Sequence, residues 1–325
     1  MRASVAWLGL IPVVAMACRG EPSSPPLEPS GASTFRVAMV LPGPIDDHSW
    51  SQAGYAALKR VSREQGIPVA HVANVSQARS EAVLREQARQ GFDLVVAHGG
   101  EFVPAAETVA AEFPQVSFAV MTAYAGNNRN LGALSFRDSE LGYLAGVVAA
   151  LKSRSGKVAF IGGFPYPSTL EVATFFQQGA SATHPGMGVA LEWVGSWDDE
   201  DTARRLARQR MAWGADVLFV MADATALGVV DEAAHAGVYV IASNWDVHAA
   251  APGTVVTSCL QHVDVLLREA VSLVQMKRWE GKQYKFGFRE GAQELAPFRG
   301  QLTPEQVAHV ERVRRDIMAG KVGIP

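Results

Sequence analysis

The chain has 325 residues, 48% of them hydrophobic, and a formal net charge of −3 at pH 7. This length is enough for two domains with a sizeable core in each, and the weak negative charge argues against a nucleic-acid polymer as a partner. The eight histidines and two cysteines are scattered without the spacing of a metal site, so neither a metal nor another cofactor is expected.

The first residues have the pattern of an export segment. Arg2 is followed by an apolar run, Val5–Ala17, that is too short to anchor the chain across a bilayer. The small residues before Cys18 resemble a lipobox, which predicts a signal peptide over residues 1–17 and lipidation at Cys18. An ordinary secretory signal with an incidental cysteine is the alternative. A Pro- and Ser-rich stretch then predicts a flexible tether over residues 18–34.

The first α/β unit places polar residues at the end of a buried strand. Val37–Leu41 is a short apolar run without alternation, as expected for a strand covered on both faces. The loop after it carries Asp46, Asp47 and Trp50, at the edge where open α/β sheets bind ligands. Each carboxylate either accepts hydrogen bonds from a ligand or caps the following helix. The Trp50 ring either stacks on a ligand or packs in the core.

The strand–loop–helix pattern repeats along the chain to about residue 245. Further strands are predicted at 68–72, 93–97, 116–121, 131–136, 158–161, 189–194, 217–221 and 238–242. Helices are predicted at 76–90, 103–113, 141–151, 170–182, 202–213 and 224–236, the third packed through small residues such as Gly142 and Gly146. Two similar halves in tandem predict an α/β fold of two doubly wound, Rossmann-like lobes with an interlobe hinge.

The tail departs from this repeat. It holds a strand candidate at 255–258, a helix at 263–276 and another strand at 284–288, and Thr303 before Pro304 marks the start of the last helix. These pieces predict that the chain returns to the first lobe and then to the second. The predicted lobes are residues 35–136 plus about 246–280 for the first, and residues 137–245 plus about 281–325 for the second.

Other loops add candidates for ligand contact. His98 and Gly99 follow a buried strand; the histidine contacts the ligand or supports the site, and the glycine permits close backbone approach or a tight turn. Phe102 and Phe164 either line the cleft or pack in the core. Asp223 follows a strand of the second half and contacts the ligand or caps the next helix.

The chain should cross between lobes near Asn244, Trp245 and Asp246, and we expect at least one of these residues to contact ligand. Enzyme motifs such as GxSxG, GxxxxGK[ST] and a GxGxxG after a strand are missing from the sequence, which argues against an enzyme.

Several stretches form an ordered set along the chain: Pro44–Trp50, Ala97–Phe102, Leu134–Arg137, Gly142–Gly146, Gly156–Gly163, Val194–Asp199, Gly214–Val217, Ala251–Val255 and Leu295–Phe298. This set resembles the basic membrane protein family of lipoproteins. These are substrate-binding components of ATP-driven importers, best known for the purine nucleoside receptors of spirochaetes. The resemblance covers about residues 35–325 and implies a periplasmic binding protein type I-like fold, with three interlobe crossovers and a ligand in the cleft.

The chain departs from the family's nucleoside box, which reads Asp–x–Ser–Phe–Asn. Here Trp50 stands for the Phe and Ser51 for the Asn. Asn244 takes the place of a family Asp, with Asp246 two residues on, and Gln261 takes that of a Lys that helps to hold ribose. The resemblance implies a nucleoside, a nucleobase or a related small polar heterocycle as the ligand, and these departures argue against the family's contacts to ribose.

Together these features predict a monomeric solute-binding lipoprotein of an ABC importer, lipid-anchored on the extracytoplasmic face of the cell membrane. Its partners would be a small-molecule ligand and the permease and ATPase subunits. One alternative is a sensory receptor that signals to a membrane kinase or chemoreceptor. Another is a secreted hydrolase built on the Asp46 and Asp47 loop, although a carboxylate pair alone is weak evidence for acid–base catalysis.

Overall fold

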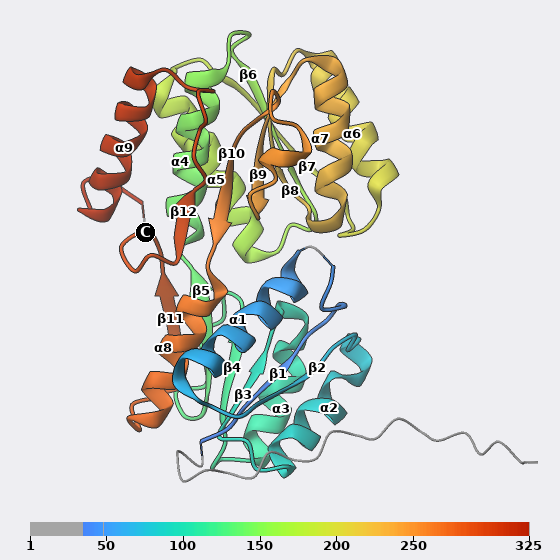
Figure 1. Cartoon of the computed structure of the whole chain (residues 1–325), viewed down its shortest axis with the longest axis vertical. Helices are drawn as coiled ribbons and strands as arrows, with labels where there is room; N and C mark the ends of the chain where they lie inside the picture. The colour runs from blue at the N-terminus through green and yellow to red at the C-terminus, as the bar shows by residue number, and fades with distance from the viewer. Residues whose placement is uncertain (1–34, 48, 325) are drawn as a thin grey trace, which may run out of the picture. The chain divides into compact units, whose positions relative to one another are not determined.

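The structure, a computed structural model, describes residues 35–47 and 49–324. The predicted signal peptide, the lipidation site Cys18 and the tether lie outside the described residues, as does His48 of the first loop. The described chain forms two six-stranded sheets with their helices (Figure 1).

The first sheet is parallel throughout, with the strand order β11-β5-β4-β3-β1-β2. Its strands are β1 (Val37–Val40), β2 (Val69–Val72), β3 (Leu94–Ala97), β4 (Ser117–Met121), β5 (Leu131–Phe136) and β11 (Gln283–Phe286). Every residue of β1 and β3 is buried, which explains why these strands have unbroken apolar runs.

The second sheet has the order β12-β10-β9-β8-β6-β7 and is parallel except for β12, which runs antiparallel to β10. Its strands are β6 (Lys157–Gly162), β7 (Gly188–Trp193), β8 (Val217–Met221), β9 (Tyr239–Asn244), β10 (Val255–Gln261) and β12 (Gln293–Leu295). The sequence did not predict β12, because three residues are too few to show a strand periodicity.

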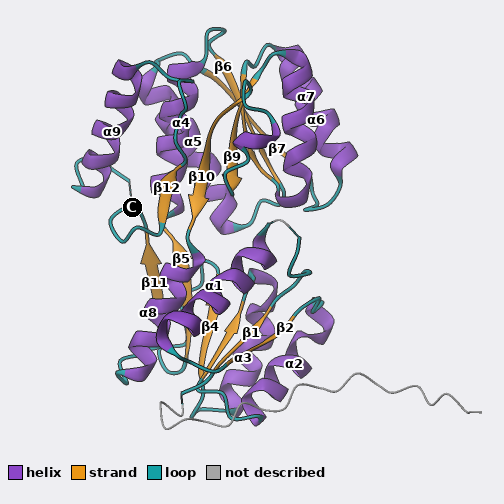
Figure 2. Ribbon diagram, in the orientation of Figure 1, coloured by secondary structure: helices purple, strands orange, loops and turns teal. Residues whose placement is uncertain are grey.

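Helices connect the strands of both sheets (Figure 2). They are α1 (Trp50–Gln65), α2 (Gln77–Arg89), α3 (Val103–Glu112), α4 (Asp138–Lys152), α5 (Pro167–Thr183), α6 (Glu200–Trp213), α7 (Ala226–Ala236), α8 (Val263–Gln275) and α9 (Pro304–Met318). Within the part of the chain that the structure describes, none of them combines the length and apolar character needed to cross a membrane.

Alternate residues of each central strand pack on opposite faces of their sheet. In β1, Val37 and Met39 join an apolar cluster with α1 and α8, while Ala38 and Val40 join one with α2 and α3. The β6 strand divides in the same way, one set packing with α4 and α5 and the other with α6 and α7. Both sheets are therefore doubly wound, which confirms the predicted fold class.

The chain passes between the two sheets three times. It leaves β5 of the first sheet for α4, which packs against α5 beside the second sheet. It returns after β10 to α8, which packs against α1, and it crosses again between β11 and β12. Three crossings are the number that the family resemblance implied.

Two tail strands lie in a different sheet from the one expected. Strand β10 falls within the range 246–280 assigned to the first lobe, but it pairs with β9 in the second sheet. Strand β11 falls within the range 281–325 assigned to the second lobe, but it pairs with β5 in the first sheet. The placement was wrong because a hydrophobic run identifies a buried strand without showing which sheet it joins.

Helices α4 and α5 pack closely through glycine. A Cβ atom added at Gly142 or Gly146 would collide with the carbonyl oxygens of Val172 and Phe176 on α5, and one added at Gly179 would collide with Tyr143 on α4. The predicted contact through Gly142 and Gly146 is therefore confirmed. This close approach fits α4, most of whose residues are buried.

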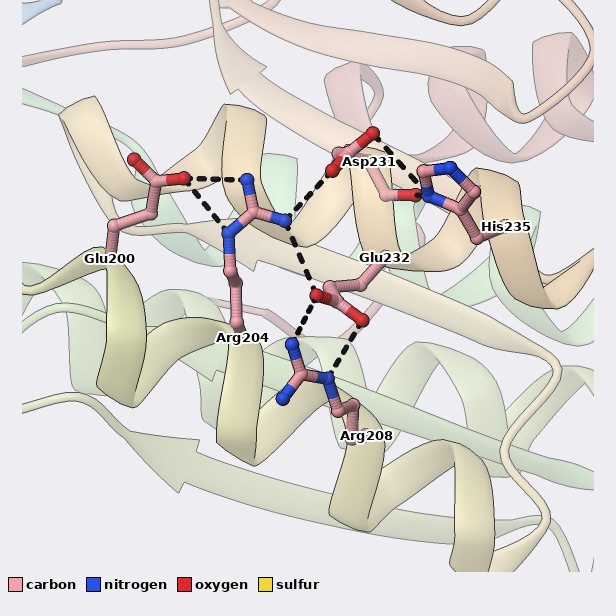
Figure 3. Close-up of polar contacts among 6 residues, drawn as sticks. All are labelled: Glu200, Arg204, Arg208, Asp231, Glu232 and His235. Atoms are coloured by element: carbon pink, nitrogen blue, oxygen red, sulfur yellow. Dashed lines mark hydrogen bonds and ion pairs between the residues drawn. The ribbon is translucent and has the colours of Figure 1, made fainter.

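Charged side chains join α6 to α7, the two helices that pack on one face of the second sheet (Figure 3). The Arg204 guanidinium lies 2.6 Å from Glu200 on its own helix and 2.8 Å from Asp231 on α7. Glu232 of α7 contacts both Arg204 and Arg208, at 3.3 Å and 2.5 Å. Hydrogen bonds from the two arginines lower the pKa of Glu232 to about 2, and the bond from Arg208 has the larger effect.

Candidate ligand-binding site

A cavity of about 450 Å³ lies between loops of the two sheets. The first sheet contributes Asp47, Ser49 and Gln52, from the loop after β1 and the start of α1. The second sheet contributes a larger set from the segment after β8, the end of β9 and the segment after β9: Asp223, Ala226, Leu227, Ser243, Asn244, Trp245, Val247 and Ala250. The cavity thus lies beside the carboxyl ends of parallel strands, where the sequence predicted a site.

Asp47 is both a wall of this cavity and the cap of α1. Its two carboxylate oxygens accept hydrogen bonds from the backbone N–H groups of Ser49, Ser51 and Gln52, at 2.8 to 2.9 Å. These N–H groups at the helix start lack partners within the helix, so the carboxylate satisfies them and complements the helix dipole. Asp46 is exposed and does not line the cavity. The capping role that the sequence left open therefore belongs to Asp47.

Ser51 supports the loop and does not line the cavity. Its side chain is buried, and its Oγ accepts a hydrogen bond from the Gly43 N–H at 2.9 Å. This bond ties the start of α1 back to the chain just after β1. A Ser at this position therefore fixes the shape of the loop that presents Asp47 and Ser49.

Trp50 stacks on His98 with ring centroids 4.1 Å apart and an angle of 14° between the planes. The Trp50 Nε1–H donates to the His98 carbonyl at 3.2 Å, and His98 Nε2 lies 2.8 Å from the Trp50 carbonyl. His98 is fully buried, which lowers its pKa to about 4 and keeps the imidazole neutral at pH 7. A neutral ring must carry its proton on Nε2 to donate to this carbonyl. One face of the Trp50 ring is thus covered by His98.

Asp223 connects the two sides of the cavity. Its Oδ1 accepts hydrogen bonds from Ser49 Oγ at 2.6 Å and from Asn244 Nδ2 at 2.9 Å. Trp245 adds a second link, because its Nε1–H donates to the Ser49 carbonyl at 3.3 Å. Burial raises the pKa of Asp223 to about 6. The alternative role as a cap is not observed, since no side chain caps the start of α7.

Asp223 and Asn244 both have left-handed backbones, with φ of 43° and 67°. This region is costly for residues other than glycine, although Asp and Asn tolerate it best. Such backbone strain gathers at functional sites. Here the two strained residues are hydrogen-bonded to each other at the cavity.

Phe102 and Gly99 lie away from the cavity lining. The Phe102 ring is fully buried in the apolar cluster that contains Leu84 and Val109, so it is core and not a cleft residue. The 3-10 helix Gly100–Phe102 turns the ring into this cluster. A Cβ on Gly99 would meet the carboxylate end of the Glu101 side chain, which is flexible and can move aside.

Three other candidates have partners elsewhere. Asp246 pairs with Arg299 at 2.5 Å, and Gln261 Nε2 lies 3.4 Å from Asp138 Oδ1. The Phe164 ring stacks on Tyr166, with centroids 5.4 Å apart, and meets Trp197 edge-on at 5.6 Å. None of these three lines the cavity. Asp246 is an exposed carboxylate two residues past the end of β9, where it meets an arginine from another loop.

Several lining residues are not predicted by the sequence pattern. Ser49 enters only as part of the family box, and Gln52 and Leu227 are not among the candidates. Each lies at the start of a helix that follows a strand end, which is the signal that could have indicated them. Trp245 was named only as one of three neighbouring candidates, although its ring nitrogen links it to Ser49.

The chain is similar to known proteins over most of its length. A family model described as "ABC transporter substrate-binding protein PnrA-like" matches residues 34–325. Basic membrane protein B of Borrelia garinii is 26% identical over 309 residues, covering 91% of this chain and 89% of that protein. A protein of Brucella abortus named as purine-binding is 26% identical over 267 residues, covering 81% and 75%.

The fold is similar to that of an ABC transporter solute-binding protein from Aeropyrum pernix K1, with a TM-score of 0.78 at 23% identity, covering 90% of this chain and 94% of that one. The matched family consists of binding proteins and not of enzymes, in agreement with the missing enzyme motifs. The chain belongs to the PnrA-like family of ABC transporter substrate-binding proteins.

Proposed function

We propose that this protein is the extracytoplasmic solute-binding lipoprotein of an ABC importer, and that it holds a nucleoside, nucleobase or related heterocycle between its two sheets. The observation that carries the proposal is the cavity whose walls come from both sheets, with Asp47 and Ser49 on one side and Asp223, Asn244 and Trp245 on the other. A volume of about 450 Å³ suits a small ligand.

A ligand must contact both sides of the cavity if its binding is to change the arrangement of the two sheets. A ligand favours the closed arrangement only if it binds that arrangement more tightly than the open one. The three connections between the sheets, after β5, after β10 and between β11 and β12, would act as the hinge. The closed form would then dock on the permease, which works with the ATPase subunit.

The ligand class is supported by the cavity's chemistry and by a relative. The Trp245 ring offers an apolar face of the kind that flat heterocycles stack on. Serine, asparagine and glutamine side chains beside it can direct a polar ring by hydrogen bonds. The relative in Brucella abortus is named as purine-binding.

The test begins with native mass spectrometry of protein purified without refolding, which identifies any ligand that it carries. Calorimetry with adenosine, guanosine and adenine then measures affinity. We expect Trp245→Ala to weaken binding by about 1–3 kcal/mol, the range for an aromatic ring stacked on a base. Trp213→Ala is the matched control, because that ring lies at the end of α6 and is outside the cavity lining.

No carried ligand and no binding of these purines would contradict the ligand class. Release of free base from a bound nucleoside would favour the hydrolase alternative. The lipid anchor is tested separately: Cys18→Ser should move the protein from the membrane fraction to the soluble fraction of the cell envelope.

A further inference from the structure

Asp223 is held in the cavity as a hydrogen-bond acceptor. Its Oδ1 receives the hydroxyl of Ser49 and the amide of Asn244, which come from opposite sides of the cavity. Two donors directed at one oxygen favour the carboxylate form, which has about four acceptor positions in all. The carboxylate therefore retains acceptor capacity for a ligand.

Among the described residues, the two ionisable groups that act most strongly on this carboxylate through charge are both acidic. The carboxylates of Asp47, from the loop before α1, and of Glu101, from the turn after β3, both act on Asp223 and oppose its ionisation. Asp47 lines the same cavity, and the described residues that line it include no lysine, arginine or histidine. Ionising a partly exposed carboxylate beside two other acidic groups is costly, so a ligand that supplies positive charge or N–H donors would stabilise it.

The backbone at this position gives independent support. Asp223 and Asn244 retain left-handed conformations that glycine would adopt at lower cost. Neither side chain is needed to start α7, which has no side-chain cap. The backbone strain therefore accompanies the polar groups that the Asp223 and Asn244 side chains place at the cavity.

We propose that Asp223 is a specificity-determining residue of this site, which binds as a carboxylate to N–H donors or to a cationic nitrogen of the ligand and discriminates against anionic ligands. This inference rests on the proposed function, because it concerns the ligand of the same cavity. It adds what the family does not state: the charge class of the ligand and the residue that selects it.

Proton linkage tests the protonation state directly. If ligand binds the ionised carboxylate, affinity rises with pH through the Asp223 pKa of about 6. From about pH 5 to about pH 7.5 the ionised fraction, and with it the affinity of the wild-type protein for adenosine, should rise about tenfold. Calorimetry in two buffers of different ionisation enthalpy should show proton release near pH 5.

The Asp223→Asn variant should lose this pH dependence. Asp246→Asn is the matched control, since its carboxylate pairs with Arg299 outside the cavity, and it should retain the dependence. Adenosine 5′-monophosphate, which adds an anionic group to the same nucleoside, should bind the wild-type protein at least about tenfold more weakly than adenosine. Asp223→Asn should reduce this preference. Thermal denaturation of each variant reports whether it is folded.

Three results would overturn the proposal: affinity that falls as pH rises, a pH dependence that Asp223→Asn leaves unchanged, or tighter binding of the monophosphate. If neither adenosine, guanosine nor adenine binds at any pH, the ligand class under the proposed function is wrong. The charge inference is then decided on the ligand identified by native mass spectrometry. An anionic ligand overturns it, and a cationic or N–H-donating ligand whose binding weakens in Asp223→Asn supports it.

Discussion

Ser49 Oγ lies 2.6 Å from Asp223 Oδ1, so a hydroxyl from the first sheet's opening loop donates to a carboxylate that follows β8 of the second sheet. Asp47 positions Ser49 for this contact, because its carboxylate accepts a hydrogen bond from the Ser49 backbone N–H and fixes the start of α1. A residue that caps a helix on one side of the cavity thereby positions the partner of a carboxylate on the other side.

Asp223 should make the protein less stable at neutral pH than in mild acid. Its pKa is about 6 in the folded protein and near 3.8 in the unfolded chain, so between these values the folded state binds more protons. Stability from this group is therefore lost as pH rises from 4 to 6. The full pKa shift would correspond to about 3 kcal/mol of unfolding free energy. The expected change is smaller than this, because the side chain keeps some contact with solvent.

The measurement compares chemical denaturation of Asp223→Asn and wild type at several pH values. The stability of the variant relative to wild type should be greater at pH 7.5 than at pH 4. His98, whose pKa is lowered to about 4, changes the free energy of unfolding in the opposite direction. Its stabilising contribution is lost as pH falls from 6.5 through 4. It is present in both proteins and cancels in the difference. A difference that is constant with pH would show that Asp223 is not perturbed.

Patterns within single elements predicted most of the fold. The capping of α9 by Thr303, with Pro304 at the first helical position, is observed as a complete capping box with Gln306. Asp199 caps α6 and accepts the Thr202 N–H at 3.0 Å. Such features depend on residues a few positions apart, so the sequence contains them directly.

The site was predicted less well, because its contacts join residues far apart in the chain. The sequence placed polar residues at the right edge of each sheet, but it could not show that Asp223 meets Ser49, 174 positions away. Nor could it show that Asp246 is neutralised by Arg299 or that Phe102 turns into the core. A strand end predicts an edge, while side-chain direction is determined by tertiary packing.

Gly54 should be needed for the contact between α1 and His98. A Cβ at this position would lie 2.7 Å from the imidazole Cδ2 and Nε2. Replacing glycine by alanine inside a helix ordinarily stabilises it by about 1 kcal/mol. Here we expect Gly54→Ala to destabilise the protein by about 1–3 kcal/mol, the cost of overpacking a filled interior. Denaturant unfolding followed by tryptophan fluorescence measures it.

Ala56→Gly is the control for Gly54→Ala. Ala56 is exposed on the same helix, so this change reports helix propensity alone and should cost about 0.5–1 kcal/mol. Equal or greater stability of Gly54→Ala would show that the ring can move aside, and that the stack of Trp50 on His98 is not tightly held.

Arg204 should join α6 to α7 through charge. It bridges Glu200 on α6 and both Asp231 and Glu232 on α7 (Figure 3). Exposed pairs contribute little individually, and salt screens them. We expect Arg204→Ala to lower the melting temperature by about 2 °C, with a smaller loss in about 1 M salt. The neighbouring Arg205 is exposed, and Arg205→Ala should have a smaller effect. Equal effects of the two changes would show that the network adds nothing specific.

Trp50 should affect stability and binding in separable ways. Its ring covers one face of His98, and its Nε1–H satisfies the His98 carbonyl. Trp50→Ala should therefore destabilise the protein by about 2–4 kcal/mol, as for loss of a largely packed aromatic side chain. If the other ring face contacts the ligand, the affinity measured by calorimetry should also fall by about 1–3 kcal/mol.

Trp50→Phe separates these effects. Phenylalanine keeps an aromatic face against His98 but loses the Nε1–H donor and the larger area of the indole, so the change should cost about 1–2 kcal/mol of stability. If Trp50 contacts the ligand, Trp50→Phe should retain most of the affinity that Trp50→Ala loses. Unchanged affinity in Trp50→Ala, measured where the variant is folded, would restrict Trp50 to a structural role and leave Trp245 as the aromatic residue lining the described cavity.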